Sequence, residues 1–590
     1  MKIIPTLGEI KSKAILSLKR FPLVLTWVII GTIFTIAIIE KKLFNILIYQ
    51  KLIMTFTLGV SWLISSRFFE EQFKKDRKWI SIIIILLLLL FNYSLIEQNI
   101  TNLAHSSKIR FWLYIVIGHI FVIVAPFIFR WHKNSFFNYV KNIAIAIFRS
   151  GFFTIIIYAG IALALLAVEN LFDYRIKSER YLQLFVFCLG IINTWIYLSD
   201  FPKNIYTDTK VNFSKPLEVL VKSILIPLII LYLVILYAYS LKIIVQWNLP
   251  RGWVSYLVIA LSFIGFIVQT LINPVQKTIK SRLINNFSPW FYYFLLPLIV
   301  LLFIGIFRRI SEYGFTEKRY LVLCLSLWIL ATTLYMLISK RKEIRFLPLG
   351  LISLFLIISV GFWGMFSVSN KSQLNRFKTS FDIIKEKEFK VALHEKNQFR
   401  DITKYLYTRN HLEKVAPIIG FNPITAFKKD KSSWGMSQKI IDTFQIEVQN
   451  NDDKLPLSKY KSYNFNFDGK TIDVKGYDSL KRLFFNKRNK ENDKIGNYNF
   501  SIDDISTVLN IFKDEKIEVY SIDLESFIND LSKNNNNQKE LNEMTLIREF
   551  EGINVKIIFT NLRFQLKKDS FYEKPKILGT TFYVLAKEKK

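Results

Sequence analysis

The sequence is poor in cysteine, histidine, glycine and proline. Its 590 residues include 2 Cys and 5 His, which excludes a disulfide-stabilised scaffold. The 21 Gly and 15 Pro are too few for a collagen-like fibre or a low-complexity chain. Acidic residues are also in deficit, because 46 Asp+Glu face 79 Lys+Arg, for a formal net charge of +33. These absences leave a basic, non-repetitive chain with few groups suited to metal binding.

Apolar residues are abundant instead. They make up 52% of the chain, 53 of them are Phe, and the mean hydropathy is +0.28. Most lie in the first two thirds, in runs close to the twenty residues that cross a bilayer as a helix. This composition excludes disorder and a purely soluble enzyme, and it predicts an α-helical polytopic membrane bundle. It indicates no activity.

The apolar runs are continuous, whereas the strands of a membrane barrel alternate apolar with polar residues. They predict about eleven transmembrane helices within residues 21–369. The expected spans are Phe21–Ile39, Leu43–Ser65, Trp79–Ile96, Phe111–Phe129, Gly151–Val168, Tyr181–Ser199, Leu217–Leu241, Trp253–Ile272, Ser288–Phe307, Tyr320–Ser339 and Phe346–Phe366.

Residues 1–20 mix apolar residues with lysines and predict an interfacial N-terminal helix. A cleaved signal peptide is the competing interpretation of the first apolar run. That run is longer than the core of a usual signal peptide, and no small-residue cleavage pattern follows it. We therefore expect it to remain as the first span.

The loops that share a side with the N-terminus carry more Lys and Arg than the others. Basic loops are retained in the cytoplasm, so we expect a multi-pass protein of the bacterial inner membrane with a cytoplasmic N-terminus. An odd number of spans then places the C-terminal domain in the periplasm. The basic loop from Phe307 to Arg319 runs against this assignment.

No Asp or Glu lies near the middle of an expected span, which weakens the case for an ion-coupled transporter built on midplane carboxylates. His119 is the most deeply placed titratable residue and is a candidate intramembrane site. A structural bond to a neighbouring helix and a pH-sensitive or ligand-binding role are both open for it. Cys188 and Cys324 lie in separate apolar runs, where packing is favoured over a metal site or a disulfide.

Two loops combine turn formers, aromatic residues and charge. The first, WNLPRGWVS, pairs a proline with a glycine between interfacial tryptophans. In the second, RRISEYGFTEKRY, Gly314 is expected to end one helix and Thr316 to cap the next. Either loop is a well-formed surface turn or a ligand-facing site. The candidate residues are Pro250, Arg251, Gly252 and Trp253 in the first loop, and Arg308, Arg309, Glu312, Tyr313, Gly314, Thr316, Glu317, Arg319 and Tyr320 in the second.

The same segments carry a family resemblance. LPRGWVS, residues Lys222 to Ile243, EYGFTEKRY, and the region from Asp401 to Ile418 are similar to the bacterial membrane proteins grouped as "domain of unknown function 4153". The resemblance extends over nearly the whole chain and implies a polytopic envelope protein of Bacteroidetes type with a polar C-terminal domain. It implies no activity and no catalytic residues.

After Phe366 the apolar runs shorten and Asn, Lys and Asp become frequent. Residues 370–410 predict a helical stalk, and residues 411–590 predict an α+β extramembrane domain of about 200 residues. The alternating YNFNFDGK segment predicts a hairpin at Asp468-Gly469. A helix is expected from Asp503 to Phe512, a strand from Lys516 to Ile522, and further strands toward the C-terminus.

The C-terminal domain shows no Gly-rich phosphate loop, no Gly-x-Ser-x-Gly sequence and no His-Glu-x-x-His helix. We predict no catalytic residue, no metal and no cofactor, and we interpret His394 and His411 as surface residues. The basic tract from Lys481 to Lys490 suits phosphates, but balancing acids and the expected location argue against nucleic acid.

Three hypotheses of function remain open, and for each the expected partners are the lipid bilayer with a small molecule, a lipid or an envelope protein. The first is a permease-like, non-enzymatic handler of a small molecule or lipid. The second is a membrane-anchored sensor or envelope assembly factor whose C-terminal domain binds a partner. The third is an envelope enzyme that acts on a lipid-linked substrate.

Overall fold

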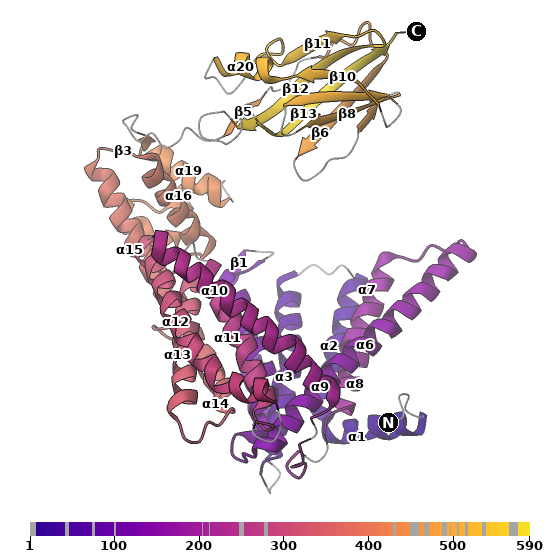
Figure 1. Cartoon of the computed structure of the whole chain (residues 1–590), viewed down its shortest axis with the longest axis vertical. Helices are drawn as coiled ribbons and strands as arrows, with labels where there is room; N and C mark the ends of the chain where they lie inside the picture. Colours follow the sequence, from indigo (N-terminus) through magenta and orange to yellow (C-terminus); the bar gives the residue numbers. More distant parts are fainter. Residues whose placement is uncertain are drawn as a thin grey trace. The chain divides into compact units, whose positions relative to one another are not determined.

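The computed structural model describes the chain except for residues 1–6, 42–45, 74–76, 100–101, 203–204, 212, 247–252, 277–280, 429–431, 449–459, 465–470, 487–492, 496, 504–506, 514–516, 534–538, 566–575 and 590. The chain divides into two compact units, Met1–Gln449 and Asn450–Lys590 (Figure 1). Each unit has its own hydrophobic core.

The first unit is a bundle of long apolar helices. In the described residues nine helical segments are long and apolar enough to cross a membrane. They are α2 (Pro22–Lys41), α3 (Ile46–Glu70), α5 with η1 (His105–Val124 and Ala125–Phe127), α6 (Lys133–Leu171), α7-η2-α8 (Ser178–Phe187, Cys188–Ile192 and Asn193–Ser199), α9-η3-α10 (Lys215–Val219, Leu220–Leu225 and Ile226–Gln246), α11 (Trp253–Ile272), α12 (Arg282–Tyr313) and α13 (Glu317–Ile338).

Two shorter apolar helices, α4 (Trp79–Ser94) and α14 (Phe346–Ser359), complete the set. Together with the nine long segments they correspond to the eleven expected spans, so the prediction of a polytopic helical bundle is confirmed. Before them lies α1 (Leu7–Arg20). A short hairpin of β1 (Glu97–Asn99) and β2 (Asn102–Leu103) joins α4 to α5.

Aromatic side chains fill the centre of the bundle. Phe68 on α3 meets Phe21 and Tyr139 edge to face, with ring centroids 5.6 Å apart in both pairs. Helix α3 packs against α2, α4 and α5, and α12 packs against α11 and α13. The outward faces stay apolar, as on α6, where Phe148, Ile155 and Leu163 are exposed. Such a surface suits a lipid environment.

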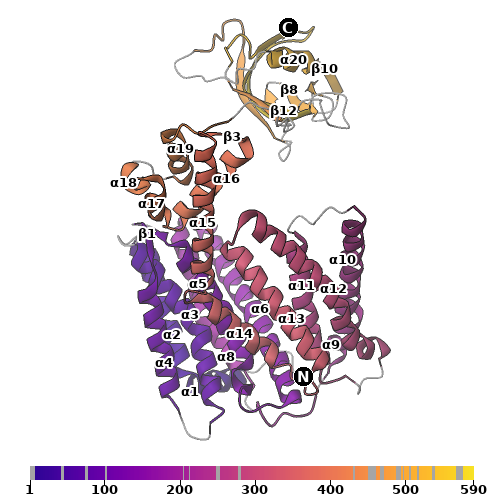
Figure 2. The ribbon, with the colours of Figure 1, turned by 90° about the vertical axis from the view of Figure 1, so that its left-hand side faces the viewer.

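The first unit continues beyond the apolar helices into a small helical subdomain, which we define as residues 365–448. Figure 2 shows α15 rising from the bundle to the other helices of this subdomain. Its elements are α15 (Met365–Glu386), β3 (Lys390–Val391), α16 (Leu393–Thr408), η4 (Leu412–Val415), α17 (Ala416–Ile419), α18 (Pro423–Ala426), α19 (Ser433–Thr443) and β4 (Glu447–Val448). Phe377 and Phe399, with ring centroids 4.9 Å apart, lie in its core. The first compact unit therefore includes the helices after residue 411, of which the last, α19, ends at Thr443.

The second unit consists of two antiparallel sheets and one helix. The first sheet has the order β11-β12-β13-β6, with β5 also paired to β12, and the second has the order β10-β9-β8-β7. The strands are β5 (Tyr460–Asn464), β6 (Ser479–Asn486), β7 (Asp493–Ile495), β8 (Tyr498–Asp503), β9 (Val508–Lys513), β10 (Ile517–Asp523), β11 (Thr545–Glu549), β12 (Ile553–Gln565) and β13 (Lys576–Glu588), and the helix is α20 (Glu525–Lys533).

One element expected in this unit is wrong. The helix expected from Asp503 to Phe512 is replaced by the end of β8 and most of β9. Leu509 and Ile511 are buried while their neighbours are more exposed, which is the alternation of a strand. The hairpin expected at Asp468-Gly469 lies outside the described residues.

Candidate functional site

The second candidate loop is a compact turn between α12 and α13. Gly314 ends α12 with a φ of +67°, and Thr316 occupies the position before α13, as the sequence predicted. The ψ of Gly314 is −179°, so its backbone lies in a region that is essentially restricted to glycine. The Thr316 side chain makes no capping hydrogen bond.

Helix α15 holds this turn in place. The Ser372 hydroxyl accepts a hydrogen bond of 3.0 Å from the backbone N–H of Phe315. The Gln373 amide donates to the carbonyl oxygens of Tyr313, at 3.0 Å, and Phe315, at 2.8 Å. A Cβ atom on Gly314 would lie 2.5 Å from Cδ of Arg376. The turn therefore joins the bundle to the helical subdomain.

Several candidate residues of this loop have structural partners. Arg319 donates to the carbonyl oxygens of Tyr313 and Gly314, at 3.1 and 3.0 Å, and so caps the C-terminus of α12. The Tyr320 hydroxyl donates to the Trp363 carbonyl at 2.6 Å.

The remaining residues of the loop lie at its edge. Arg308 and Glu312 form an exposed ion pair of 2.8 Å one turn apart on α12. Arg309 is partly buried on the same turn. The structure therefore favours the surface-turn interpretation for most of this loop.

Glu317 is the exception because it faces inward. This first residue of α13 is only 3% exposed. Its carboxylate pairs with Arg409, which follows α16, through contacts of 3.0 Å to Nε and 3.4 Å to Nη2. The pair connects two helices that are far apart in sequence.

The Glu317–Arg409 pair lies in the wall of a cavity of about 420 Å³, which we call the basic cavity. Its walls come from the N-terminal part of α5, the start of α13, the first turns of α15, and the segment after α16. The lining residues are Ile96, Ser106, Arg110, Glu317, Phe366, Ser367, Asn370, Lys371, Leu374, Arg409, His411 and Lys414.

Positive charge dominates this lining. Arg110, Lys371, Arg409 and Lys414 supply four cationic groups, whereas Glu317 supplies one carboxylate, already paired with Arg409. The basic cavity therefore has three cationic side chains in excess of its own acid. Such an excess favours an anion.

Polar atoms of the lining are also available for a ligand. Among the described contacts, Nε of Arg110, Oδ1 of Asn370 and Nδ1 of His411 are buried without a hydrogen-bond partner. The Arg110 guanidinium lies 4.9 Å from the centre of the Phe366 ring, which holds it in place. Burial and the nearby Lys414 lower the pKa of His411.

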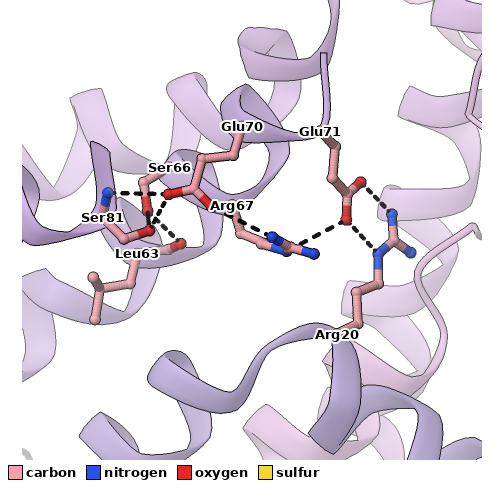
Figure 3. Close-up of polar contacts among 7 residues, drawn as sticks. All are labelled: Arg20, Leu63, Ser66, Arg67, Glu70, Glu71 and Ser81. Atoms are coloured by element: carbon pink, nitrogen blue, oxygen red, sulfur yellow. Dashed lines mark hydrogen bonds and ion pairs between the residues drawn. The ribbon is translucent and has the colours of Figure 1, made fainter. Parts of the chain in front are cut away.

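A second polar cluster, which we call the ion-pair network, joins residues at the ends of α1 and α3 and at the start of α4. Arg20 donates two bonds of 2.8 Å to the Glu71 carboxylate. Figure 3 shows Arg67 between two carboxylates, 3.4 Å from that of Glu70 and 3.7 Å from that of Glu71. Ser81 donates its N–H and hydroxyl to Glu70, at 3.0 and 2.6 Å. Two cations and two carboxylates balance here.

The other candidate residues do not join either cluster. Pro250, Arg251 and Gly252 lie outside the described residues, and only the backbone of Trp253, at the start of α11, is described. His119 is exposed on α5, with Nδ1 2.8 Å from the carbonyl oxygen of Ile115 in the preceding turn of its own helix.

Both cysteines are buried and free in separate helical segments, Cys188 in η2 and Cys324 in α13. Within the described part of the chain, no group of three or more His, Cys, Asp or Glu side chains is arranged to hold a metal ion.

Sequence reasoning missed most of the basic cavity. It treated His411 as a surface residue, whereas His411 is partly buried in the cavity lining, and it did not single out Arg110. The one local signal was the cluster of basic residues and histidine in TRNHLEK, which includes Arg409, His411 and Lys414. Residues from α5, α13 and α15 meet there only in the folded chain.

The fold defines a multi-pass helical membrane protein. Residues 23–384 match the family model described as a domain of unknown function, DUF4153, and the chain belongs to this family. The match confirms the family resemblance for residues 23–384, whereas its extension to Asp401–Ile418 and the Bacteroidetes lineage stay predictions.

A similar protein is an uncharacterized protein of Pasteurella multocida (strain Pm70), which is 26% identical over 277 residues. The aligned region covers 45% of this chain and 45% of that protein, so it spans less than half of either. No solved structure matches the chain.

Proposed function

We propose that this protein binds an anionic ligand in the basic cavity and thereby acts as a permease-like handler of a small molecule or a lipid. The excess of cationic side chains in the cavity carries the proposal. The shared chemistry is a phosphate or carboxylate group, supplied either by a free solute or by the headgroup of a lipid.

The available donors suit such a group. An arginine presents a planar set of N–H donors that matches the oxygens of phosphate and carboxylate, and Arg110 offers its buried Nε. Lys371 and Lys414 add two exposed positive charges to the lining. Ser106 lies in the first turn of α5, where the helix dipole favours an anion. The volume of about 420 Å³ lies within the usual range for small-molecule sites.

We also propose the orientation in which the N-terminus is cytoplasmic. The bias of basic loops supports it, and alternate helices of an eleven-span bundle then place the α12–α13 turn on the outer side. The basic cavity opens on that side in this arrangement. It would receive ligands from the periplasm of an inner-membrane protein.

A sensor is the second candidate, because the cavity wall includes α15 and the segment after α16. A ligand held between Arg110 and Lys414 would contact both the bundle and the helical subdomain. Occupancy would then favour one arrangement of the subdomain over another. No comparable observation supports the enzyme hypothesis.

Titration of the purified full chain tests the proposal. Sulfate and inorganic phosphate are the soluble probes, and nanodiscs of phosphatidylglycerol or phosphatidylcholine distinguish a headgroup from a free anion. We expect the Arg110→Gln/Lys371→Gln variant to weaken binding at least about tenfold, since hydrogen bonds to charged groups contribute about 1.5–3 kcal/mol each.

Arg308→Gln is the matched control, because Arg308 is an exposed arginine outside the cavity lining. Equal loss in both variants would contradict the assignment of the cavity. Uptake of the same anions into vesicles containing the protein separates the two candidates, since a permease moves the anion across the membrane and a sensor only binds it.

A further inference from the structure

A second large cavity lies between α10 and α12, two of the membrane-crossing segments, and we call it the apolar groove. Its volume is about 1020 Å³. The two helices contact one another, and Figure 2 shows them at the same edge of the bundle. The groove is lined by Ile230, Leu233, Val234, Tyr237, Ala238, Leu241, Arg282, Leu283, Asn286, Phe287, Trp290, Phe291 and Phe294.

The lining is polarised along its length. Tyr237 uses its hydroxyl to donate to the Phe294 carbonyl at 2.8 Å, so it presents mainly its ring to the groove. The other polar side chains, Arg282 and Asn286, lie one helical turn apart at the N-terminal end of α12. The groove therefore has one cationic end and a long apolar remainder.

Its length matches one leaflet of a bilayer. On α12 the lining runs from Arg282 to Phe294, which spans about 18 Å at 1.5 Å per residue. Half of a hydrocarbon core of about 30 Å is about 15 Å. With Arg282 at headgroup level, the apolar part of the groove extends roughly to the middle of the membrane.

Aromatic rings stiffen one wall. Trp290 and Phe294 stack with ring centroids 5.8 Å apart, and both remain exposed. Phe287 and Phe291, 5.6 Å apart, are buried behind them. A rigid apolar wall reduces the entropy lost when a flexible chain is ordered against it.

We propose that the apolar groove binds an anionic glycerophospholipid from the leaflet at the N-terminal end of α12. Its phosphate pairs with Arg282, and an acyl chain lies along the aromatic wall toward Phe294. The charge at the headgroup level favours this occupant over a second copy of the chain, which would cover Arg282 and require a carboxylate opposite it.

This site is separate from the basic cavity. Helix α12 has 32 residues and is about 48 Å long, and the two sites adjoin its opposite ends. The inference therefore does not depend on the proposed anion-binding function. Loss of lipid from the groove would leave sulfate binding in the cavity unchanged.

Native mass spectrometry of the full chain released from nanodiscs tests the inference. Discs of equal phosphatidylglycerol and phosphatidylcholine content are used, and the retained lipid is counted and identified. We expect one retained lipid, enriched about fivefold in phosphatidylglycerol, because one basic residue near the surface contributes about that factor. Arg282→Gln should abolish the enrichment.

A second variant separates groove filling from misfolding. Ala238→Trp places an indole in the groove at an exposed position of α10, and we expect it to abolish lipid retention. Ala164→Trp on α6 is the matched control, because Ala164 is also exposed but does not line the groove. We expect this control to retain the lipid.

Three results would overturn the proposal: retention in Ala238→Trp equal to that in Ala164→Trp, enrichment that survives Arg282→Gln, or a dimer that releases no lipid. Sulfate binding in the same variants provides an independent readout. A loss confined to lipid retention supports the groove as a lipid site.

Discussion

The two polar clusters of the first unit, the ion-pair network and the basic cavity, differ in how their charges balance. In the ion-pair network two arginines meet two carboxylates, each carboxylate within 3.7 Å of a guanidinium. In the basic cavity four cationic side chains surround one carboxylate. The network pairs its cations with its carboxylates, whereas the cavity lining has three more cationic side chains than carboxylates.

The cost of burial explains why the difference matters. A charge that leaves water is strongly disfavoured unless partners replace the lost solvation. Glu70 is 4% exposed and has that replacement from Arg67 and Ser81. Arg110 and Lys371 have no carboxylate of their own in the cavity lining, because its one acid, Glu317, is paired with Arg409. Under the proposed function, a bound anion would supply the missing partner.

The largest expected effect lies in the ion-pair network. Glu71→Ala removes the carboxylate that accepts both bonds from Arg20, and it leaves a partly buried guanidinium without its acid. We expect the free energy of unfolding to fall by about 3–5 kcal/mol. Thermal unfolding of the purified protein in detergent, followed by tryptophan fluorescence, measures the change.

Glu312→Ala is the control for this variant. It breaks an exposed one-turn ion pair with Arg308, which contributes about 0.3–0.5 kcal/mol. Similar losses in the two variants would show that the network is no more stabilising than a surface pair.

The second largest loss of stability is expected at Gly314, whose turn positions Glu317 in the wall of the basic cavity. Alanine there requires a backbone conformation that non-glycine residues avoid, and its Cβ approaches Arg376 within 2.5 Å. We expect Gly314→Ala to lower stability by about 1–3 kcal/mol and also to weaken sulfate binding.

Gly420→Ala is the matched substitution. Gly420 also has a positive φ, of 85°, but a Cβ there meets nothing within 4 Å. The expected loss is about 1–2 kcal/mol with no change in sulfate affinity. Unfolding curves and sulfate titrations of both variants distinguish backbone strain from damage to the cavity. An unchanged sulfate affinity in Gly314→Ala would show that the turn does not position the cavity wall.

A third variant is expected to raise the free energy of unfolding rather than lower it. Lys371→Gln/Lys414→Gln removes two of the cations that repel one another in the cavity. Both side chains are exposed, so without anions we expect stability to rise by no more than about 0.5 kcal/mol while sulfate affinity falls. The same unfolding measurement, made with and without sulfate, tests this. A loss of stability without sulfate would contradict the idea of an unbalanced cavity.

The apolar helices were predictable because twenty-residue apolar runs have few alternatives in a membrane protein. Their ends were less predictable. The span expected from Gly151 belongs to a helix that begins at Lys133, since polar residues at a helix end do not mark where the backbone stops being helical. The helix expected from Asp503 failed because local caps and apolar spacing resembled a helix while tertiary pairing produced strands.

The two polar clusters could not be predicted from the sequence for a different reason. Arg20 and Glu71 are 51 residues apart, and Glu317 and Arg409 are 92 residues apart. No periodicity connects such positions, because the contact depends on how helices pack. Gly314 and Thr316 were found because helix ends have local signatures.

The smallest expected effect concerns pH. The low pKa of His411 reflects burial and Lys414, while Glu413 and Glu317 act in the opposite direction. Below the ordinary histidine pKa of about 6.5, the unfolded chain takes up a proton more readily than the folded chain. The stability that neutral His411 contributes is therefore present above that pH and is lost as the pH falls.

A bound anion favours the protonated form of His411 in the folded chain, because the negative charge stabilises the imidazolium. Sulfate affinity should therefore rise as the pH falls from 7.5 to 5.5, because His411 takes up a proton more readily beside a bound anion. Sulfate is the suitable probe because a phosphate monoester itself titrates near pH 6. His411→Gln should remove the pH dependence, whereas His105→Gln, on α5 near Glu317 and Arg409, serves as the control for the neighbouring histidine. The pH dependence of sulfate affinity could instead persist in His411→Gln and disappear in His105→Gln. That result would assign the response to His105 on α5 and place the anion closer to the bundle than to the helical subdomain.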